Sequence, residues 1–262
     1  RIGVRDDKTP HAAAYEPSYN TKTGNTMTII EKTNPNKTAR IAAILYLLMV
    51  PLGFFGYMYV PSILKVPGDA AATVQNIINS GLLYRLSIVS ALTVQIINIF
   101  LVIVLYKLLK AVNKTHALFM VIFLLIGTPI AMLSQLNLVA ALLLSNGVGY
   151  LQAFTAEQLQ AQVMLFLDLH RHGAYIAGIF FGLWLFPMGY LVFKSGFLPR
   201  ILGILLMIGC FGYLIDSFAY FLDPSFKEIV MFTFWGEILF PLWLLIKGVN
   251  VEQWEKRMLV SG

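Results

Sequence analysis

Four ionisable side chains crowd into the stretch FLDLHRHGAY, residues 166–175, at the point where a long apolar run begins. They are Asp168, His170, Arg171 and His172. A histidine near a carboxylate can act as a general base, a metal ligand or a proton carrier. The same side chains can instead form a polar collar where a helix meets the lipid surface. Which reading applies depends on the direction in which each side chain points.

Helical phase separates these four residues into two groups. At about 100° per residue, His170 lies within a stripe of small residues, Gly173, Ala174, Ala177 and Gly178. Such stripes let membrane helices approach closely, so we expect His170 to point into a helix bundle. Asp168 and His172 are one turn apart and lie roughly opposite His170, with Arg171 beside them. We predict that these three form an interfacial collar.

Three further ionisable residues, Arg85, Asp216 and Glu237, fall within apolar runs. An ionisable residue at membrane depth is costly and is therefore a candidate for a functional site. Counting along the runs places Arg85 and Asp216 at about the level of His170, whereas Glu237 falls close to the middle of its run. We predict a polar pocket formed by Arg85, His170, Asp216 and Glu237.

Each pocket residue also has a structural interpretation. His170 can be a packing histidine, and Asp216 with Arg85 can form an ion pair between helices. Glu237, as a lone carboxyl, must be either paired or protonated, and the protonated form would suit a proton relay. Gln95, Asn98 and Gln135 would extend the polar interior as hydrogen-bonding partners between helices.

No spacing of ligands indicates a metal or a cofactor. The sequence has no HExxH or GxSxG pattern and no glycine-rich phosphate loop. The single cysteine, Cys210, excludes an intrachain disulfide and a cysteine cluster. We predict no cofactor and no metal site, and the enzyme question stays open, with the balance toward no catalysis.

Composition defines the elements that must carry these residues. Apolar residues make up 58% of the 262 and charged residues only 12%, as in an integral membrane protein. The formal charge of +6 does not indicate nucleic acid, because the basic residues lie beside apolar runs and not among exposed aromatic residues.

Six segments are each long enough to cross a membrane, which takes about 20 helical residues. They are residues 38–60, 82–110, 117–145, 161–193, 198–222 and 228–247. The sequence thus predicts an all-α, polytopic membrane protein. Short amphipathic helices are expected on the outer surface, as after the N-cap Asp69. The capping box that Thr155 and Gln158 would form is expected to start, outside the lipid, the helix that becomes the fourth span.

Basic residues gather in alternate loops and so orient the six segments. The positive-inside rule places both termini in the cytoplasm and the loops 61–81, 146–160 and 223–227 outside. The predicted pocket then faces the outer side. We expect a flexible cytoplasmic N-terminal tail over residues 1–37, a transmembrane domain over 38–250 and a cytoplasmic C-terminal tail over 251–262. Because Met27 opens a new stretch, residues 1–26 need not belong to the natural protein.

Several stretches carry a resemblance to a known family. They are TARIAAILYLL, VPGDAAATVQNI, LLYRLSIVS, FLDLH with Gly173, KSGFLPRILGILL, GYLIDS and WLLIKGVN. Residues 38–250 resemble the bacterial six-span membrane family called domain of unknown function 4386. The resemblance implies a bacterial inner-membrane location and a shared helical fold, and it implies no activity. His172 and the long N-terminal tail depart from the family pattern.

Three function hypotheses follow. The leading one is a noncatalytic or sensory membrane protein whose outer-facing polar pocket binds a lipid, a small amphiphile or a partner membrane subunit. The second is an intramembrane enzyme acting on a lipid-like substrate, with His170 as general base or metal ligand and Asp216 as the residue that orients it. The third is a small proton-coupled transporter that uses Glu237.

Overall fold

The structure, a computed structural model, describes residues 34–223 and 225–261, and within those ranges it contains helices and no strand. Five helical stretches are long and apolar enough to cross a membrane, or six if the bent pair Val230–Ile246 and Val251–Val260 forms one span. The predicted all-α class is confirmed. Of the predicted N-terminal tail, residues 1–33 lie outside the described residues, and residues 35–37 already belong to the first helix.

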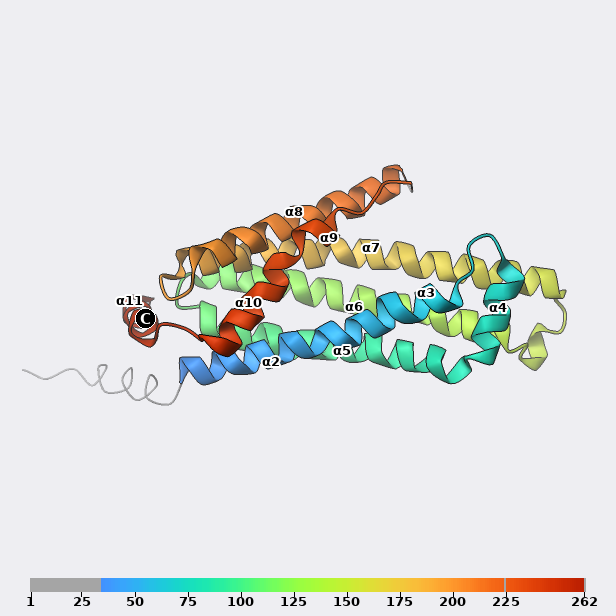
Figure 1. The fold of residues 1–262 in the computed structure, drawn as a ribbon, viewed down its shortest axis with the longest axis horizontal. Coiled ribbons are helices and arrows are strands. Elements are labelled where there is room, and N and C mark those ends of the chain that lie inside the picture. Colours follow the sequence, from blue (N-terminus) through green and yellow to red (C-terminus); the bar gives the residue numbers. More distant parts are fainter. Residues whose placement is uncertain (1–33, 224, 262) are drawn as a thin grey trace, which may run out of the picture. The chain divides into compact units, whose positions relative to one another are not determined.

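The long helices lie side by side along the length of the bundle (Figure 1). They are α2 (Pro35–Gly53), which continues through the π-helix η1 (Phe54–Tyr59) into α3 (Val60–Leu64), and then α5 (Gly81–Leu109), α6 (Lys114–Ser145), α7 (Ala156–Ser195) and α8 (Arg200–Leu222). The shorter elements are α4 (Ala70–Asn79), the 3-10 helix η2 (Gly149–Leu151), α9 (Val230–Thr233), α10 (Trp235–Ile246) and α11 (Val251–Ser261).

The two short helices α4 and α11 mark opposite ends of the bundle, here called the α4 end and the α11 end (Figure 1). At the α4 end, the Asp69 carboxylate accepts a hydrogen bond of 2.8 Å from the Ala72 amide and caps α4. Thr155 and Gln158 form the reciprocal capping box at the start of α7. Both N-caps that the sequence predicts are therefore present.

Helix α7 is the central element, because it packs along α6 on one side and along α8 on the other. Its contact with α8 is closest at a pair of glycines near the α11 end. A methyl group on Gly189 would lie 2.6 Å from the carbonyl oxygen of Gly203, too close for any side chain. These two positions therefore let the two backbones touch.

Helix α11 packs against the end of the bundle, where the sequence predicts a cytoplasmic tail over residues 251–262. The Trp254 ring is 2% exposed, and its indole N–H donates a hydrogen bond of 2.9 Å to the carbonyl oxygen of Leu108. Arg257 donates to the carbonyl oxygens of Lys194 and Ser195 at the end of α7. These contacts satisfy helix-terminal carbonyls that have no partner within their own helices.

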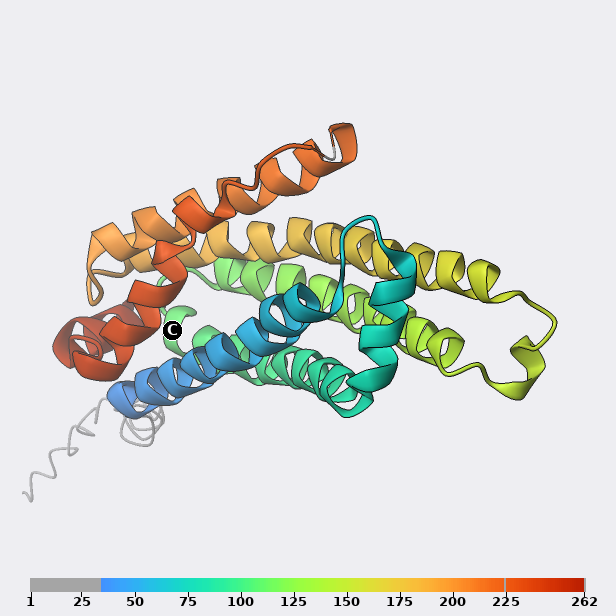
Figure 2. The same cartoon turned by 45° about the vertical axis from the view of Figure 1, so that its right-hand side comes forward.

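Helices α2 and α10 pack together near the α11 end and separate toward the α4 end. Helix α10 contacts both α2 and α8. From that contact the α2–η1–α3 helix and the α9–α10 segment diverge like the arms of a V, as both views show (Figures 1 and 2). The space between these arms positions the site described next.

Candidate binding cavity

A cavity of about 660 Å³ lies between η1 and α3 on one side and α8 and α9 on the other, with α7 contributing the longest part of its wall. The polar residues that line it are Tyr57, Ser62, Lys65, His170, Arg171, Tyr175, Tyr213, Asp216, Ser217 and Glu228. The remaining lining residues are Pro61, Pro67, Ala174, Gly178 and Val230. The structure thus brings two of the four predicted pocket residues, His170 and Asp216, to one cavity.

The π-helix η1 carries Tyr57 into the cavity wall. It follows Pro51, which cannot supply a backbone N–H, and single π-turns of this kind are common near functional sites. The Tyr57 hydroxyl accepts a hydrogen bond of 3.0 Å from the Gln95 amide. Asn98 in turn donates to the Gln95 side-chain oxygen at 3.3 Å. A polar chain therefore leads from the cavity into the space between η1 and α5.

His170 is held in place by Ser134 of α6. Its Nδ1 lies 3.1 Å from the Ser134 carbonyl oxygen, and the Ser134 hydroxyl donates to the His170 carbonyl at 2.9 Å. Because a carbonyl can only accept, Nδ1 must carry the proton in this arrangement, and Nε2 of the neutral ring keeps its lone pair. Gly173 permits the contact, since a side chain there would collide with Ser134.

Asp216 accepts hydrogen bonds from the backbone at the start of the last span. Its two carboxylate oxygens accept hydrogen bonds of 2.8 Å from the amides of Ile229 and Val230, one from each. These amides lead into α9, so the 5% exposed carboxylate acts as a cap supplied by another helix. Asp216 neither pairs with Arg85 nor hydrogen-bonds His170, and both of the roles considered from the sequence give way to this one.

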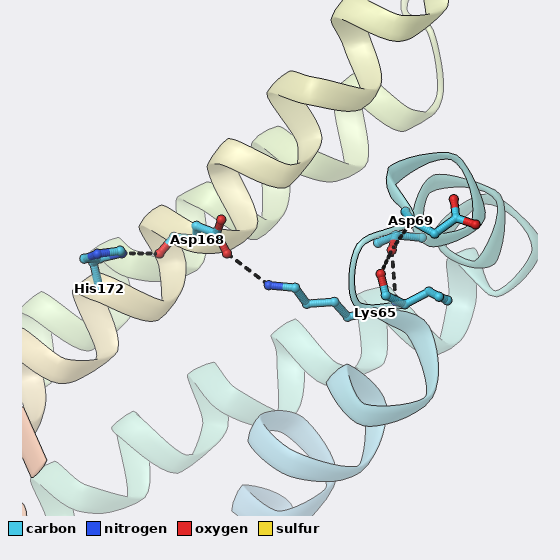
Figure 3. Close-up of polar contacts among 6 residues, drawn as sticks. Lys65, Asp69, Asp168 and His172 are labelled. Atoms are coloured by element: carbon cyan, nitrogen blue, oxygen red, sulfur yellow. Dashed lines mark hydrogen bonds and ion pairs between the residues drawn. The ribbon is translucent and has the colours of Figure 1, made fainter. Parts of the chain in front are cut away.

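The three predicted collar residues have separate partners. Asp168 forms an ion pair of 3.0 Å with Lys65, and His172 Nδ1 lies 2.7 Å from the backbone carbonyl of Asp168 and not from its carboxylate (Figure 3). The Arg171 guanidinium lies over the ring of Tyr220. The collar therefore ties α7 to α8 and to the end of α3, and Arg171 also reaches the cavity wall.

Two charged residues of the wall were missed from the sequence, Lys65 and Glu228. Glu228 accepts a hydrogen bond from the Tyr175 hydroxyl across the cavity mouth. Lys65 had a usable signal, because it is the only basic residue between the first two predicted spans, on the side where basic residues are scarce.

Arg85 and Glu237, the other two predicted pocket residues, do not line the cavity. Arg85 is exposed on α5. Glu237 stands in the first turn of α10, where its Oε2 accepts a hydrogen bond of 2.8 Å from the Tyr46 hydroxyl. The predicted four-residue pocket is thus divided between the cavity, the surface of α5 and a separate, half-buried position in α10.

A smaller apolar pocket of about 70 Å³ adjoins the cavity. The two share Pro61, Lys65 and His170, and the smaller one is otherwise lined mainly by Val60, Leu64, Ile77, Tyr84, Leu138 and Leu167. His170 therefore stands between a polar space and an apolar one. Among residues 34–223 and 225–261, no group of three or more histidine, cysteine or acidic side chains could hold a metal ion.

Apolar helices of spanning length, with a polar cavity between them, define a polytopic helical membrane protein. Residues 41–248 match the family described as Domain of unknown function (DUF4386), and the chain belongs to that family. It is also 34% identical over 167 residues to an uncharacterized protein of Archaeoglobus fulgidus, an alignment that covers 64% of this chain and 86% of the relative. No solved structure matches the chain.

Proposed function

We propose that this protein binds an amphiphile with an anionic headgroup in the cavity between α3, α7 and α8. The observation that carries the proposal is a polar cavity of about 660 Å³ set among membrane-spanning helices, a volume typical of small-molecule sites. Charged side chains at membrane depth are costly when nothing polar solvates them. The cavity therefore needs water or a polar ligand to fill it.

The hydrogen bonds already present in the wall favour an anion. Both oxygens of Asp216 are taken by backbone amides, and Glu228 accepts from Tyr175. Arg171, by contrast, forms no ion pair among the described residues, and its contacts with the Tyr220 ring and the Tyr175 hydroxyl use only part of its five N–H donors. Lys65 uses one contact on Asp168 and has further donors. The two cations of the wall, Lys65 and Arg171, therefore keep unused donors, which suit phosphate or carboxylate oxygens.

The apolar part of the wall favours an amphiphile over a simple ion. Proline, alanine and valine side chains lie beside the charged groups, and the apolar pocket continues the space past His170. A headgroup held by Arg171 and Lys65 could place the first carbons of its chain there.

The proposed orientation places the α4 end, and with it the cavity, on the outer side of a bacterial inner membrane. Basic residues of the described chain concentrate at the α11 end, in the loops around Lys110, Arg200 and Lys247 and on α11. Reporter fusions after Gly147 and after Ser261 test this. A cytoplasmic signal from the first, or an external signal from the second, would contradict it.

The test of binding is native mass spectrometry of the protein in neutral detergent with added phosphatidylglycerol or phosphatidylcholine. Arg171→Gln should lose the preference for phosphatidylglycerol that the wild type shows. Arg85→Gln is the matched control, because Arg85 is also exposed near the α4 end but lies outside the cavity. Equal loss in the two variants would mean that the lipid surface is responsible. A copurified polypeptide with no lipid preference would favour a partner subunit instead.

The geometry of His170 supports a second candidate, an enzyme acting on the same kind of ligand. Its protonated Nδ1 is fixed by Ser134, which leaves Nε2 able to accept a proton, as in a general base. Incubation with phosphatidylglycerol should then yield a product detectable by mass, and His170→Gln should abolish the product while binding persists. Product formation by the variant would remove His170 from that role.

A further inference from the structure

Glu237 forms a second polar site that is separate from the cavity wall. It lies just after the break between α9 and α10, where α10 crosses α2 and α8. Tyr46 of α2 donates to its Oε2 at 2.8 Å. Its Oε1 is buried and has no hydrogen-bond partner among the described residues. A buried carboxyl oxygen without a partner is uncommon and calls for an explanation.

The neighbours of Glu237 offer hydroxyl groups and no positive charge. From α2 the titratable group that faces it is Tyr46, whose ring stacks on Trp184. From α8 it is Tyr213, which interacts electrostatically with both Glu237 and Asp216. Asp216 is itself occupied by the amides of Ile229 and Val230. No ion pair to Glu237 forms within the described residues, so a negative charge there would be uncompensated.

Tyr213 connects this buried carboxyl to the cavity. It lines the cavity wall, and its hydroxyl also lies close enough to interact with the Glu237 carboxyl, although no hydrogen bond of ordinary geometry reaches Oε1. A hydroxyl can donate one proton while it accepts another. Tyr213 is therefore placed to pass protons between the solvent of the cavity and the free carboxyl oxygen.

We infer that Glu237 is a proton-binding site that exchanges with the cavity through the hydroxyl of Tyr213. In the uptake step, Tyr213 gives its hydroxyl proton to Oε1 of Glu237 and takes one from a hydronium ion in the cavity. The carboxylate becomes a carboxylic acid, the hydronium ion becomes water, and Tyr213 is unchanged. Tyr46 keeps its hydrogen bond to Oε2 throughout.

This site would link proton exchange to occupation of the cavity. A ligand that fills the cavity covers Tyr213 and so closes the route from the cavity to Glu237. Proton exchange at Glu237 requires only the cavity and the two tyrosines, whatever the charge of the ligand. The lipid-binding test and the test below can therefore fail independently.

Infrared difference spectroscopy of the full-length protein in nanodiscs tests the inference. A protonated carboxylic acid has a carbonyl band that a carboxylate lacks. The wild type should show this band in the neutral pH range, Glu237→Gln should lose it, and Glu252→Gln, which removes an exposed carboxyl on α11, should keep it. A band that survives in Glu237→Gln, or the absence of any such band in the wild type, would overturn the assignment.

The route is tested separately by hydrogen–deuterium exchange of the same band. Tyr213→Phe should slow the deuterium shift at least about tenfold, because the relaying hydroxyl is gone. Exchange at the wild-type rate would show that the proton travels by another path. If Glu237→Gln does not fold, carbon-13 labelling of the wild type replaces it. The band must then move with labelled glutamate and stay with labelled aspartate, and the reverse result would assign the proton to Asp216.

Discussion

The α11 end and the cavity of this bundle share helices α7 and α8 but are packed in opposite ways. Near the α11 end, large apolar side chains such as Leu105, Leu185 and Met188 are fully buried, and Trp254 covers them from outside. In the cavity, tyrosines and charged residues from α3, α7 and α8 surround open space. Helix α7 runs through both regions and changes between them, with His170, Arg171 and Tyr175 at the cavity and Leu185 and Met188 at the filled end.

The packed α11 end and the open cavity have different roles in the bundle. The filled end fixes the positions of α2, α7, α8 and α10. That rigidity allows α3 and α9 to stand apart at the other end without collapsing together. Stability should therefore be concentrated at the α11 end, and ligand binding should depend on residues whose removal changes stability little.

The largest effect is expected from Trp254→Ala. Removing a fully buried indole costs about 3–5 kcal/mol, and the Leu108 carbonyl loses its donor. We expect α11 to detach, with faster proteolysis after Asn250 and a lower unfolding temperature. Leu259→Ala, on the exposed side of α11, is the control and should behave like the wild type. Equal protease sensitivity of the two variants would contradict the docking of α11.

The next effect concerns the glycine contact between α7 and α8. Gly203→Ala should lower the free energy of unfolding by about 1–3 kcal/mol, because the added methyl would lie 2.6 Å from the Phe193 amide nitrogen. Gly81→Ala is the matched control at the α4 end, where nothing lies within 4 Å of the added methyl. It should raise stability by up to about 1 kcal/mol through helix propensity. Denaturation in detergent measures both, and a loss of stability in Gly81→Ala would reverse the comparison.

A smaller effect is expected at the border between the two regions. Asp216→Ala removes the acceptor of the Ile229 and Val230 amides, at a cost of about 0.5–2 kcal/mol. Hydrogen exchange of these two amides should accelerate, while amides of α11 keep their protection. Asp223→Ala, which affects only hydrogen bonds to Ser225, serves as the control. Unchanged exchange at residues 229 and 230 would show that the cap is not needed.

The smallest effect on stability is expected from Lys65→Met, about 0.5 kcal/mol, because the Lys65–Asp168 pair is partly exposed. Binding of phosphatidylglycerol should nevertheless weaken, since Lys65 lines the cavity. Lys256→Met breaks the comparable pair with Glu252 on α11 and should change neither stability nor binding noticeably. If both variants lose binding alike, net charge and not the cavity is responsible.

The sequence was informative where local patterns decide the outcome. Apolar runs gave the spans, and the residues that cap α4 and α7 were read from spacing alone. The small-residue stripe correctly indicated the close contact of His170 with α6. The same phase argument could have excluded Arg85, because the buried face of α5 contains Tyr84, Ile88 and Gln95 and Arg85 points away from it.

Other features depend on tertiary contacts that no local pattern contains. The role of Asp216 requires the start of α9 to return to α8 after a loop. The docking of α11 had a weak signal, the apolar spacing of Val251, Trp254 and Met258, but only the Leu108 carbonyl gives it a partner. The π-helix η1 packs closely against α5 at Gly56, where a side chain would lie 3.0 Å from the Ser87 carbonyl.

The π-helix also determines which side of the first span meets the cavity. A π-turn holds one residue more than an α-turn, and one residue corresponds to about 100° of rotation around a helix. Deletion of one residue from 54–59 would restore an ordinary α-helix and leave the phase of α3 unchanged, because the π-turn absorbs that residue. Relaxation of η1 to an α-helix with all its residues kept would instead turn α3 by about 100° relative to α2. Ser62 and Lys65 would then leave the cavity and an apolar face would replace them. The π-turn thus accommodates one residue more than an α-helix would and keeps the polar side chains of α3 at the cavity.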